Sequence, residues 1–127
     1  MKRLAVFGTV LLLLIGGVAY AKDYKVEKKA GGYNIEIKID KNPPVVGDNN
    51  IEIEIKDVSG KYITDANVKV EYSMPGMPPM NYKTGTVLKG YKYRATMDLP
   101  MSGSWNIAVK ITRGGKATKV KFNVDAR

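Results

Sequence analysis

The sequence predicts an all-β protein, and three observations carry this prediction. Apolar and charged residues alternate with a period of two, as in Ile35-Glu-Ile-Lys-Ile39 and Val68-Lys-Val-Glu-Tyr72. This period places apolar side chains on one face of a strand and charged ones on the other. No long segment of the sequence has helical spacing, and turn residues separate the alternating segments. We expect an immunoglobulin-like two-sheet sandwich of about seven strands, with a small barrel as the alternative.

The first element is an N-terminal segment typical of export. A basic start, Met1-Lys-Arg3, precedes an uncharged run from Leu4 to Ala21 that ends in the small-x-small pattern Ala19-Tyr-Ala21. These features predict a signal peptide over residues 1–21 and a periplasmic or extracytoplasmic location. The run is near the lower length limit for crossing a bilayer, so an uncleaved anchor is the alternative.

The rest of the chain is expected to form one domain. Residues 22–32 are polar and are interpreted as a leader, although 24–28 could also form a first strand. Residues 33–127 have the size of a single domain with one core. Cysteine is absent, so neither disulfides nor thiolate metal sites can stabilise the fold, and burial must hold it together.

Strands are predicted in order wherever the alternation runs, at residues 33–40, 50–57, 66–73, 84–88, 91–98, 105–112 and 117–124. Turn-forming residues separate them: Asn42-Pro-Pro44 lies in one connection and Asp57 begins another. Arg113-Gly-Gly-Lys116 predicts a tight hairpin between the last two strands.

The parity of each strand predicts which side chains face the core. A one-residue slip would turn the lysines and glutamates inward, so burial should set the register. The inward residues are predicted to be Ile35, Ile37, Ile39, Ile51, Ile53, Ile55, Val68, Val70, Tyr72, Tyr91, Tyr93, Ala95, Met97, Trp105, Ile107, Val109, Ile111, Val120, Phe122 and Val124.

The chain is basic, with a formal net charge of +9. Its lysines alternate with apolar residues instead of clustering, which is typical of a solvated sheet face. Attraction to anionic lipid or to acidic partners is the alternative interpretation. Nucleic acid is not an expected partner of an exported protein.

Catalysis is not expected. Histidine and cysteine are both absent, and these are the side chains best suited to proton transfer and nucleophilic attack near neutral pH. The carboxylates fall at outward strand positions or in turns, where Asp bonds to the local backbone. Asp57 and Asp65 flank a loop, but no spaced ligand series resembles a calcium loop.

The segment from Tyr72 to Tyr82, YSMPGMPPMNY, carries the most specific chemistry. Met74, Met77 and Met80 recur at three-residue spacing. Thioether sulfur is a soft ligand that favours Cu(I) and does not need to lose a proton. Metal binding, capping of the core, and an exposed protein-binding surface are all open interpretations of these methionines.

Geometry constrains the metal interpretation. Met74 and Met77 each precede a proline, which favours an extended backbone. In a polyproline II segment, every third side chain projects from the same side, and successive ones are roughly 9 Å apart along the axis. For three sulfurs to meet one ion the chain must bend, and Gly76 is where it can. Alternatively, two of these methionines could meet Met97 or Met101. Met97 is expected in the core, because it continues the inward-facing positions set by Tyr93 and Ala95.

An ordered set of short motifs resembles the YtkA-like family, which is related to FixH-like domains. The set comprises Asp57-x-x-Gly60, Ala66-x-Val68, Met74-Pro-Gly-Met77, Lys89-Gly-Tyr-Lys-Tyr-Arg-Ala95 and Leu99-Pro-Met-Ser-Gly-Ser-Trp105. The resemblance implies an exported or membrane-anchored immunoglobulin-like sandwich that handles copper beside heavy-metal efflux or cytochrome-oxidase assembly components. By position Met74, Met77 and Met101 match the family motif, whereas Met80 is suggested by this sequence alone. Family members often carry a histidine near the first methionine motif, where this chain has Asn81 and Tyr82.

Two functions are therefore expected from different classes. The first is a small exported protein that carries or buffers Cu(I), or Ag(I) as its analogue, through Met74, Met77 and Met80, with Met101 as an additional ligand. Its partner would be a copper-handling, efflux or oxidase protein of the envelope, and it would contact the membrane only through an uncleaved N-terminal segment. The second is a metal-free envelope interaction or structural module that docks through its Pro/Met loop and its basic sheet face.

Overall fold

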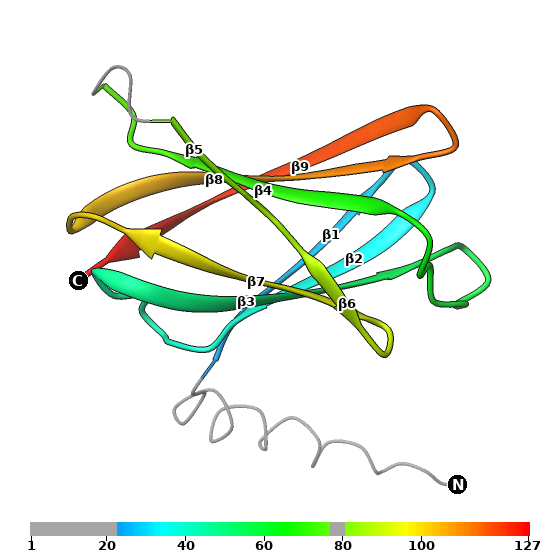
Figure 1. Ribbon diagram of the computed structural model, residues 1–127, viewed down its shortest axis with the longest axis horizontal. Helices are drawn as coiled ribbons and strands as arrows, with labels where there is room; N and C mark the ends of the chain where they lie inside the picture. The colour runs from blue at the N-terminus through cyan, green and yellow to red at the C-terminus, as the bar shows by residue number, and fades with distance from the viewer. Residues whose placement is uncertain (1–22, 77–80) are drawn as a thin grey trace, which may run out of the picture.

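A computed structural model describes residues 23–76 and 81–127, which form two antiparallel sheets packed as a sandwich (Figure 1). The five-stranded sheet has the order β1-β2-β3-β7-β6 and the four-stranded sheet the order β5-β4-β8-β9. The strands are β1 (Tyr24–Ala30), β2 (Tyr33–Ile39), β3 (Gly47–Lys56), β4 (Asn67–Ser73), β5 (Asn81–Gly85), β6 (Val87–Lys89), β7 (Lys92–Leu99), β8 (Gly103–Arg113) and β9 (Lys116–Ala126). The described residues contain no helix, and the predicted all-β sandwich is confirmed.

A ladder of isoleucines forms the inner side of the five-stranded sheet. The register pairs Ile35 with Ile55, Ile37 with Ile53 and Ile39 with Ile51 across β2 and β3. Each of these six side chains is at most 2% exposed. β-Branched side chains pack well on a pleated surface, so these cross-strand pairs both fix the register and supply much of the core. Met97 and Trp105, each 0% exposed, lie in the same core from β7 and β8.

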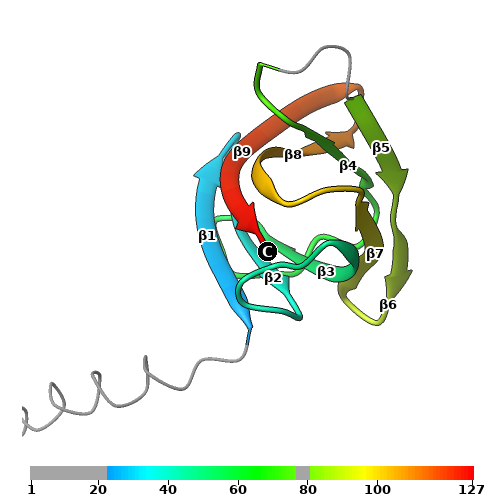
Figure 2. The same ribbon diagram turned by 90° about the vertical axis from the view of Figure 1, so that its left-hand side faces the viewer.

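The sheets meet along both long sides of the sandwich (Figure 2). On one side the chain passes directly from β5 into β6, so it leaves one sheet and joins the other. Between the two strands, the Thr86 hydroxyl donates a hydrogen bond of 2.9 Å to the carbonyl oxygen of Val68. The prediction of one continuous strand over residues 84–88 is therefore wrong. Alternation continues through the crossing, and for this reason the pattern did not reveal it.

On the other side, β1 lies beside β9 (Figure 2). β1 pairs with β2 over its whole length, from Tyr24 opposite Ile39 to Ala30 opposite Tyr33. The Tyr24 ring stacks on Phe122 of β9 with 6.1 Å between ring centroids. The interpretation of this segment as a polar leader is wrong, and the alternative of a first strand is correct. Charged side chains fill its outward positions and made the segment look unstructured.

The predicted core is correct with few exceptions. Ala95 is partly buried, and Tyr91 is 45% exposed. Tyr91 lies in the two-residue turn that follows β6, where strand parity no longer applies, and its ring stacks on Tyr62 at 4.1 Å. Three further side chains belong to the buried hydrophobic core. Ile63 lies outside the predicted strands, and Leu99 and Ala126 continue the inward parity just beyond the predicted strand ends.

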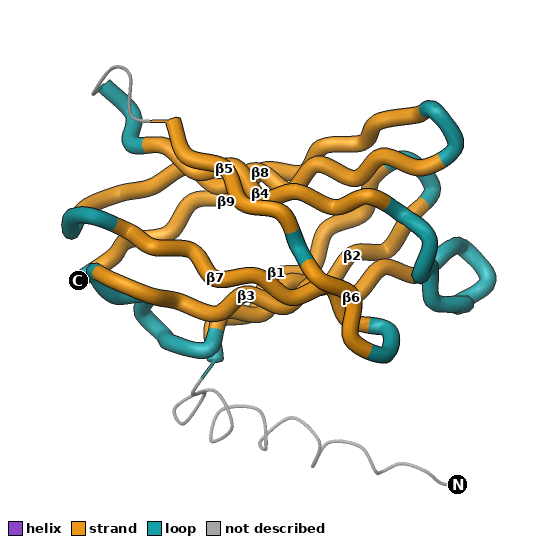
Figure 3. The backbone as a smooth tube through the Cα atoms, in the orientation of Figure 1, coloured by secondary structure: helices purple, strands orange, loops and turns teal. Residues whose placement is uncertain are grey.

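Most loops lie at the two ends of the sandwich (Figure 3). The predicted hairpin at Arg113 and Lys116 is confirmed, since these residues pair directly and Gly114 and Gly115 have φ of 57° and 80°. Positive φ at both central residues is what a type I′ turn requires. At Asp57, one carboxylate oxygen accepts bonds from the Ser59 hydroxyl and from the backbone N–H groups of Ser59 and Lys61, so this aspartate is a turn residue.

Candidate metal site at the methionine end

The predicted methionine segment connects two neighbouring strands of the four-stranded sheet. β4 ends at Ser73 and β5 begins at Asn81, and these two residues face each other in the register. The structure describes Met74, Pro75 and Gly76 of the connection. Met77 and Met80 lie outside the described residues. The methionine end of the sandwich is defined here as residues 73–76, 81–82 and 100–105.

Met74 reaches across this end toward the start of β8. Its side chain is partly buried against the core. A Cβ placed on Gly103 would lie only 2.6 Å from the Met74 methyl carbon, Cε. Gly103 has a φ of 127°, a conformation that other residues rarely adopt. Glycine at this position therefore provides the space into which the Met74 thioether extends.

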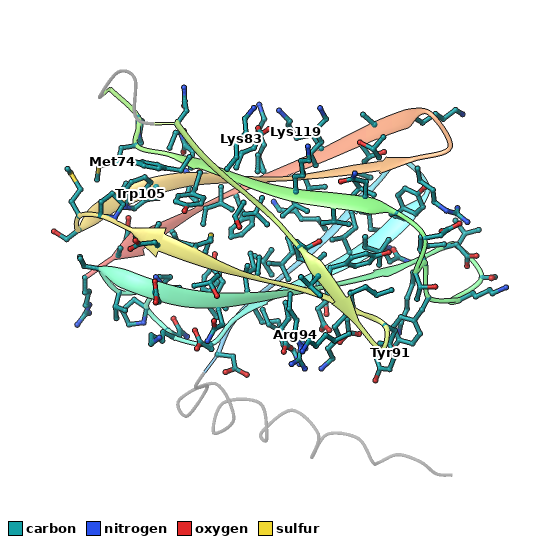
Figure 4. All side chains as sticks on the ribbon, in the orientation of Figure 1. Met74, Lys83, Tyr91, Arg94, Trp105 and Lys119 are labelled. Carbon is teal, nitrogen blue, oxygen red and sulfur yellow. The ribbon has the colours of Figure 1, made fainter. Side chains whose placement is uncertain are left out.

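Met101 lies two residues before Gly103, in the connection between β7 and β8. Its side chain is 37% exposed. Its carbonyl oxygen accepts a 3.0 Å hydrogen bond from the indole Nε1 of the buried Trp105, which fixes the connection to the core. Figure 4 places the labelled Met74 and Trp105 at the same end of the sandwich. The structure thus brings the Met74 side chain and the segment carrying Met101 together.

Three aromatic rings form a cluster at the methionine end. Tyr72 stacks on Tyr82 with 5.4 Å between centroids, and Trp105 meets each of them at 6.0 Å. Burial raises the pKa of the Tyr72 hydroxyl, which accepts a bond from the backbone N–H of Asp98 in the opposite sheet. The cluster supports Ser73 and Asn81, the strand ends that carry the methionine segment. Strand parity predicted Tyr72 and Trp105 in the core but did not mark Tyr82, although Tyr82 and Thr84 alternate with polar neighbours.

Met97 lies within the hydrophobic core. Its side chain is 0% exposed within the core, as its inward parity predicted. Of the two methionines considered as further ligands, Met101 is exposed and Met97 is buried.

Acidic side chains do not gather into a metal-binding cluster in the described part of the chain. Over residues 23–76 and 81–127, no three His, Cys, Asp or Glu side chains come together in a way that could hold an ion. Asp65 binds Arg113 at 2.7 Å, and Asp57 is occupied by its own turn. The described thioethers at this end belong to Met74 and Met101.

Within the same ranges, no helix is long and apolar enough to span a membrane.

A family model of YtkA-like proteins matches residues 27–110 of the 127-residue chain. The match extends from β1 into β8 and includes Met74, Met101 and Trp105. A comparison with curated proteins gives no significant match. Because the family model covers well over half of the chain, this protein belongs to the YtkA-like family.

Proposed function

We propose that this protein is an exported metal-binding protein that carries or buffers Cu(I). The ligands are the thioethers of Met74, Met77 and Met80, with Met101 as an additional ligand. The observation that supports the proposal most strongly is the contact of Met74 Cε with the Gly103 position, beside the exposed Met101. Two sulfur-bearing segments that are distant in sequence thereby converge at one end of the sandwich.

The chemistry of the donor set favours a carrier. Thioethers select Cu(I) over Zn(II) and harder ions, and they bind without losing a proton. Affinity should therefore stay constant from about pH 5 to about pH 8, where histidine and cysteine sites change their protonation. A site that includes the exposed Met101 could also pass its ion to a partner. The partner would be a copper-handling efflux or oxidase protein of the envelope, and the N-terminal segment 1–21 would direct export.

The test is an anaerobic titration of residues 22–127 with Cu(I) against a competing chelator. Both sheets and the whole described core lie between Tyr24 and Ala126, so this fragment retains the fold. Met77→Leu removes one proposed ligand at nearly constant volume and should weaken binding at least about tenfold. Met97→Leu is the matched control, because it removes a fully buried sulfur and should leave affinity unchanged. Equal affinities for all three proteins would contradict the proposal.

The alternative is a metal-free envelope module, and the partial burial of Met74 against the core favours it. Methionine is an adaptable packing residue, so the Met74 contact can be explained by packing alone. The same titration separates the two functions. If the wild-type protein never competes with the chelator, the methionine end is a packing or docking element and the carrier function is wrong.

A further inference from the structure

The outward face of the four-stranded sheet carries an excess of lysines. The lysine face is defined here by Lys69, Lys83, Lys110, Lys119 and Lys121, which lie at outward positions of β4, β5, β8 and β9. Two carboxylates share the face: Glu71 among the lysines and Asp125 toward the methionine end. Figure 4 shows the labelled Lys83 and Lys119 pointing away from the core, on the side opposite Arg94.

The two sheets differ in how their charges are paired. On the five-stranded sheet, Lys25 bonds Glu36 at 2.9 Å, Arg94 bonds Glu52 at 3.1 Å and Lys92 approaches Glu54 at 3.8 Å. On the lysine face only Lys119 has an acidic partner, Glu71, at 3.3 Å. The other four lysines form no ion pair with any described residue. The positive charge of this face is therefore largely uncompensated.

The register arranges these charges in rows across the sheet. Lys83, Glu71, Ala108 and Lys121 lie in one row, and Lys69, Lys110 and Lys119 lie in the next. Neighbouring strands are about 4.8 Å apart, so the rows form a broad array across the sheet. An open hollow of about 590 Å³ lies over Ala108, and Glu71 lines it together with Lys83, Lys119 and Lys121.

We propose that the lysine face docks on an anionic phospholipid surface. A lysine ammonium is a point charge on a flexible stem and suits diffuse negative charge, whereas arginine suits fixed bidentate partners. None of the large exposed apolar residues of the described chain lies on this face, so binding is electrostatic and peripheral, without insertion. This docking uses the domain itself and does not depend on retention of residues 1–21.

Docking in this orientation would hold the methionine segment beside the bilayer. That segment leaves β4 and returns to β5 at Ser73 and Asn81, which belong to the same sheet as the lysines. The protein would then meet membrane-bound partners by diffusion along the surface. Lipid binding itself does not require copper, so it can be tested separately from the carrier function.

The test is co-sedimentation of the protein with vesicles. The wild type should bind vesicles containing about 30% phosphatidylglycerol, should not bind pure phosphatidylcholine, and should be released by about 0.5 M salt. A variant with Lys69, Lys83, Lys110 and Lys121 changed to Gln should lose roughly two orders of magnitude or more in partitioning. The control changes Lys29, Lys38, Lys61 and Lys89 to Gln, which gives the same net charge but leaves the lysine face intact. It should keep most of the binding.

A variant with increased vesicle binding provides a test that misfolding cannot explain. Glu71→Gln removes the carboxylate among the lysines and frees Lys119, so vesicle binding should increase several-fold. Failure of the wild type to bind anionic vesicles, or equal losses in both lysine variants, would overturn the proposal. If the wild type binds soluble poly-L-glutamate but not vesicles, the face recognises acidic polypeptides and the lipid proposal is wrong. Cu(I) titration of the lysine-face variant should match the wild type, which separates the two functions.

Discussion

Gly103→Ala tests the link between the fold and the methionine site. The added Cβ would lie 2.6 Å from Met74 Cε, whereas carbon atoms in contact are about 3.5 to 4 Å apart. The Met74 methyl group must therefore retreat by about 1 Å. Because it is the end of a flexible side chain, this movement costs little, and most of the cost comes from placing alanine at a φ of 127°. We expect the free energy of unfolding to fall by about 1 to 3 kcal/mol.

The assay is urea unfolding followed by the fluorescence of Trp105, the one tryptophan of the chain. Gly85→Ala is the control, because a Cβ there meets nothing within 4 Å and Gly85 has no positive φ. It should change stability by less than about 0.5 kcal/mol. Displacement of the Met74 thioether should also weaken Cu(I) binding in Gly103→Ala. If both glycine variants are equally stable and bind Cu(I) equally, the space at Gly103 does not position Met74.

Three further substitutions test the fold and its electrostatics. Ile53→Ala removes a fully buried side chain from the centre of the isoleucine ladder. The free energy of unfolding, measured in urea, should fall by about 2 to 5 kcal/mol. A fall of less than about 1 kcal/mol would contradict the packing described. Trp105→Phe removes the hydrogen-bond donor to the Met101 carbonyl oxygen. Amide hydrogen exchange in the connection between β7 and β8 should therefore accelerate. Unchanged exchange would show that this hydrogen bond does not hold the connection in place. Hydrogen bonds from the Ser59 hydroxyl and the Lys61 N–H lower the pKa of Asp57 in the folded protein. The contribution of this carboxylate to stability is therefore present above its ordinary pKa near 4 and is lost as pH falls through the lower folded-state pKa. Asp57→Asn should make the acid limb of a stability–pH profile shallower below about pH 5, and an unchanged profile would refute this role.

The fold was predictable because one rule, alternation with burial on one face, applies to almost every strand. The rule fails where the chain turns, changes sheets or buries its inner face only in part. At Tyr91 the chain is turning, so parity no longer sets the side-chain direction. At Thr86 the chain changes sheets without breaking the alternation. Over β1, outward charges and a half-buried inner face hide a strand that full pairing with β2 stabilises.

The candidate site was only partly predictable. Residue type and spacing identified the methionines, but contacts between distant segments depend on tertiary structure. The space at Gly103 is an example: its sequence signal was a glycine within Met101-Ser-Gly-Ser-Trp105, and only the fold shows that Met74 reaches it. The lysine face was a similar case. Alternation predicted outward lysines, whereas their collection on one sheet follows from the strand order β5-β4-β8-β9.

The central proposal is that methionine sulfur alone binds Cu(I). X-ray absorption at the copper edge, on protein loaded anaerobically with one equivalent of Cu(I), tests this most directly. We predict a first shell of sulfur neighbours without nitrogen or oxygen, and fewer sulfurs in Met77→Leu but not in Met97→Leu. A first shell of nitrogen or oxygen, or a sulfur shell unaffected by Met77→Leu, would contradict the account.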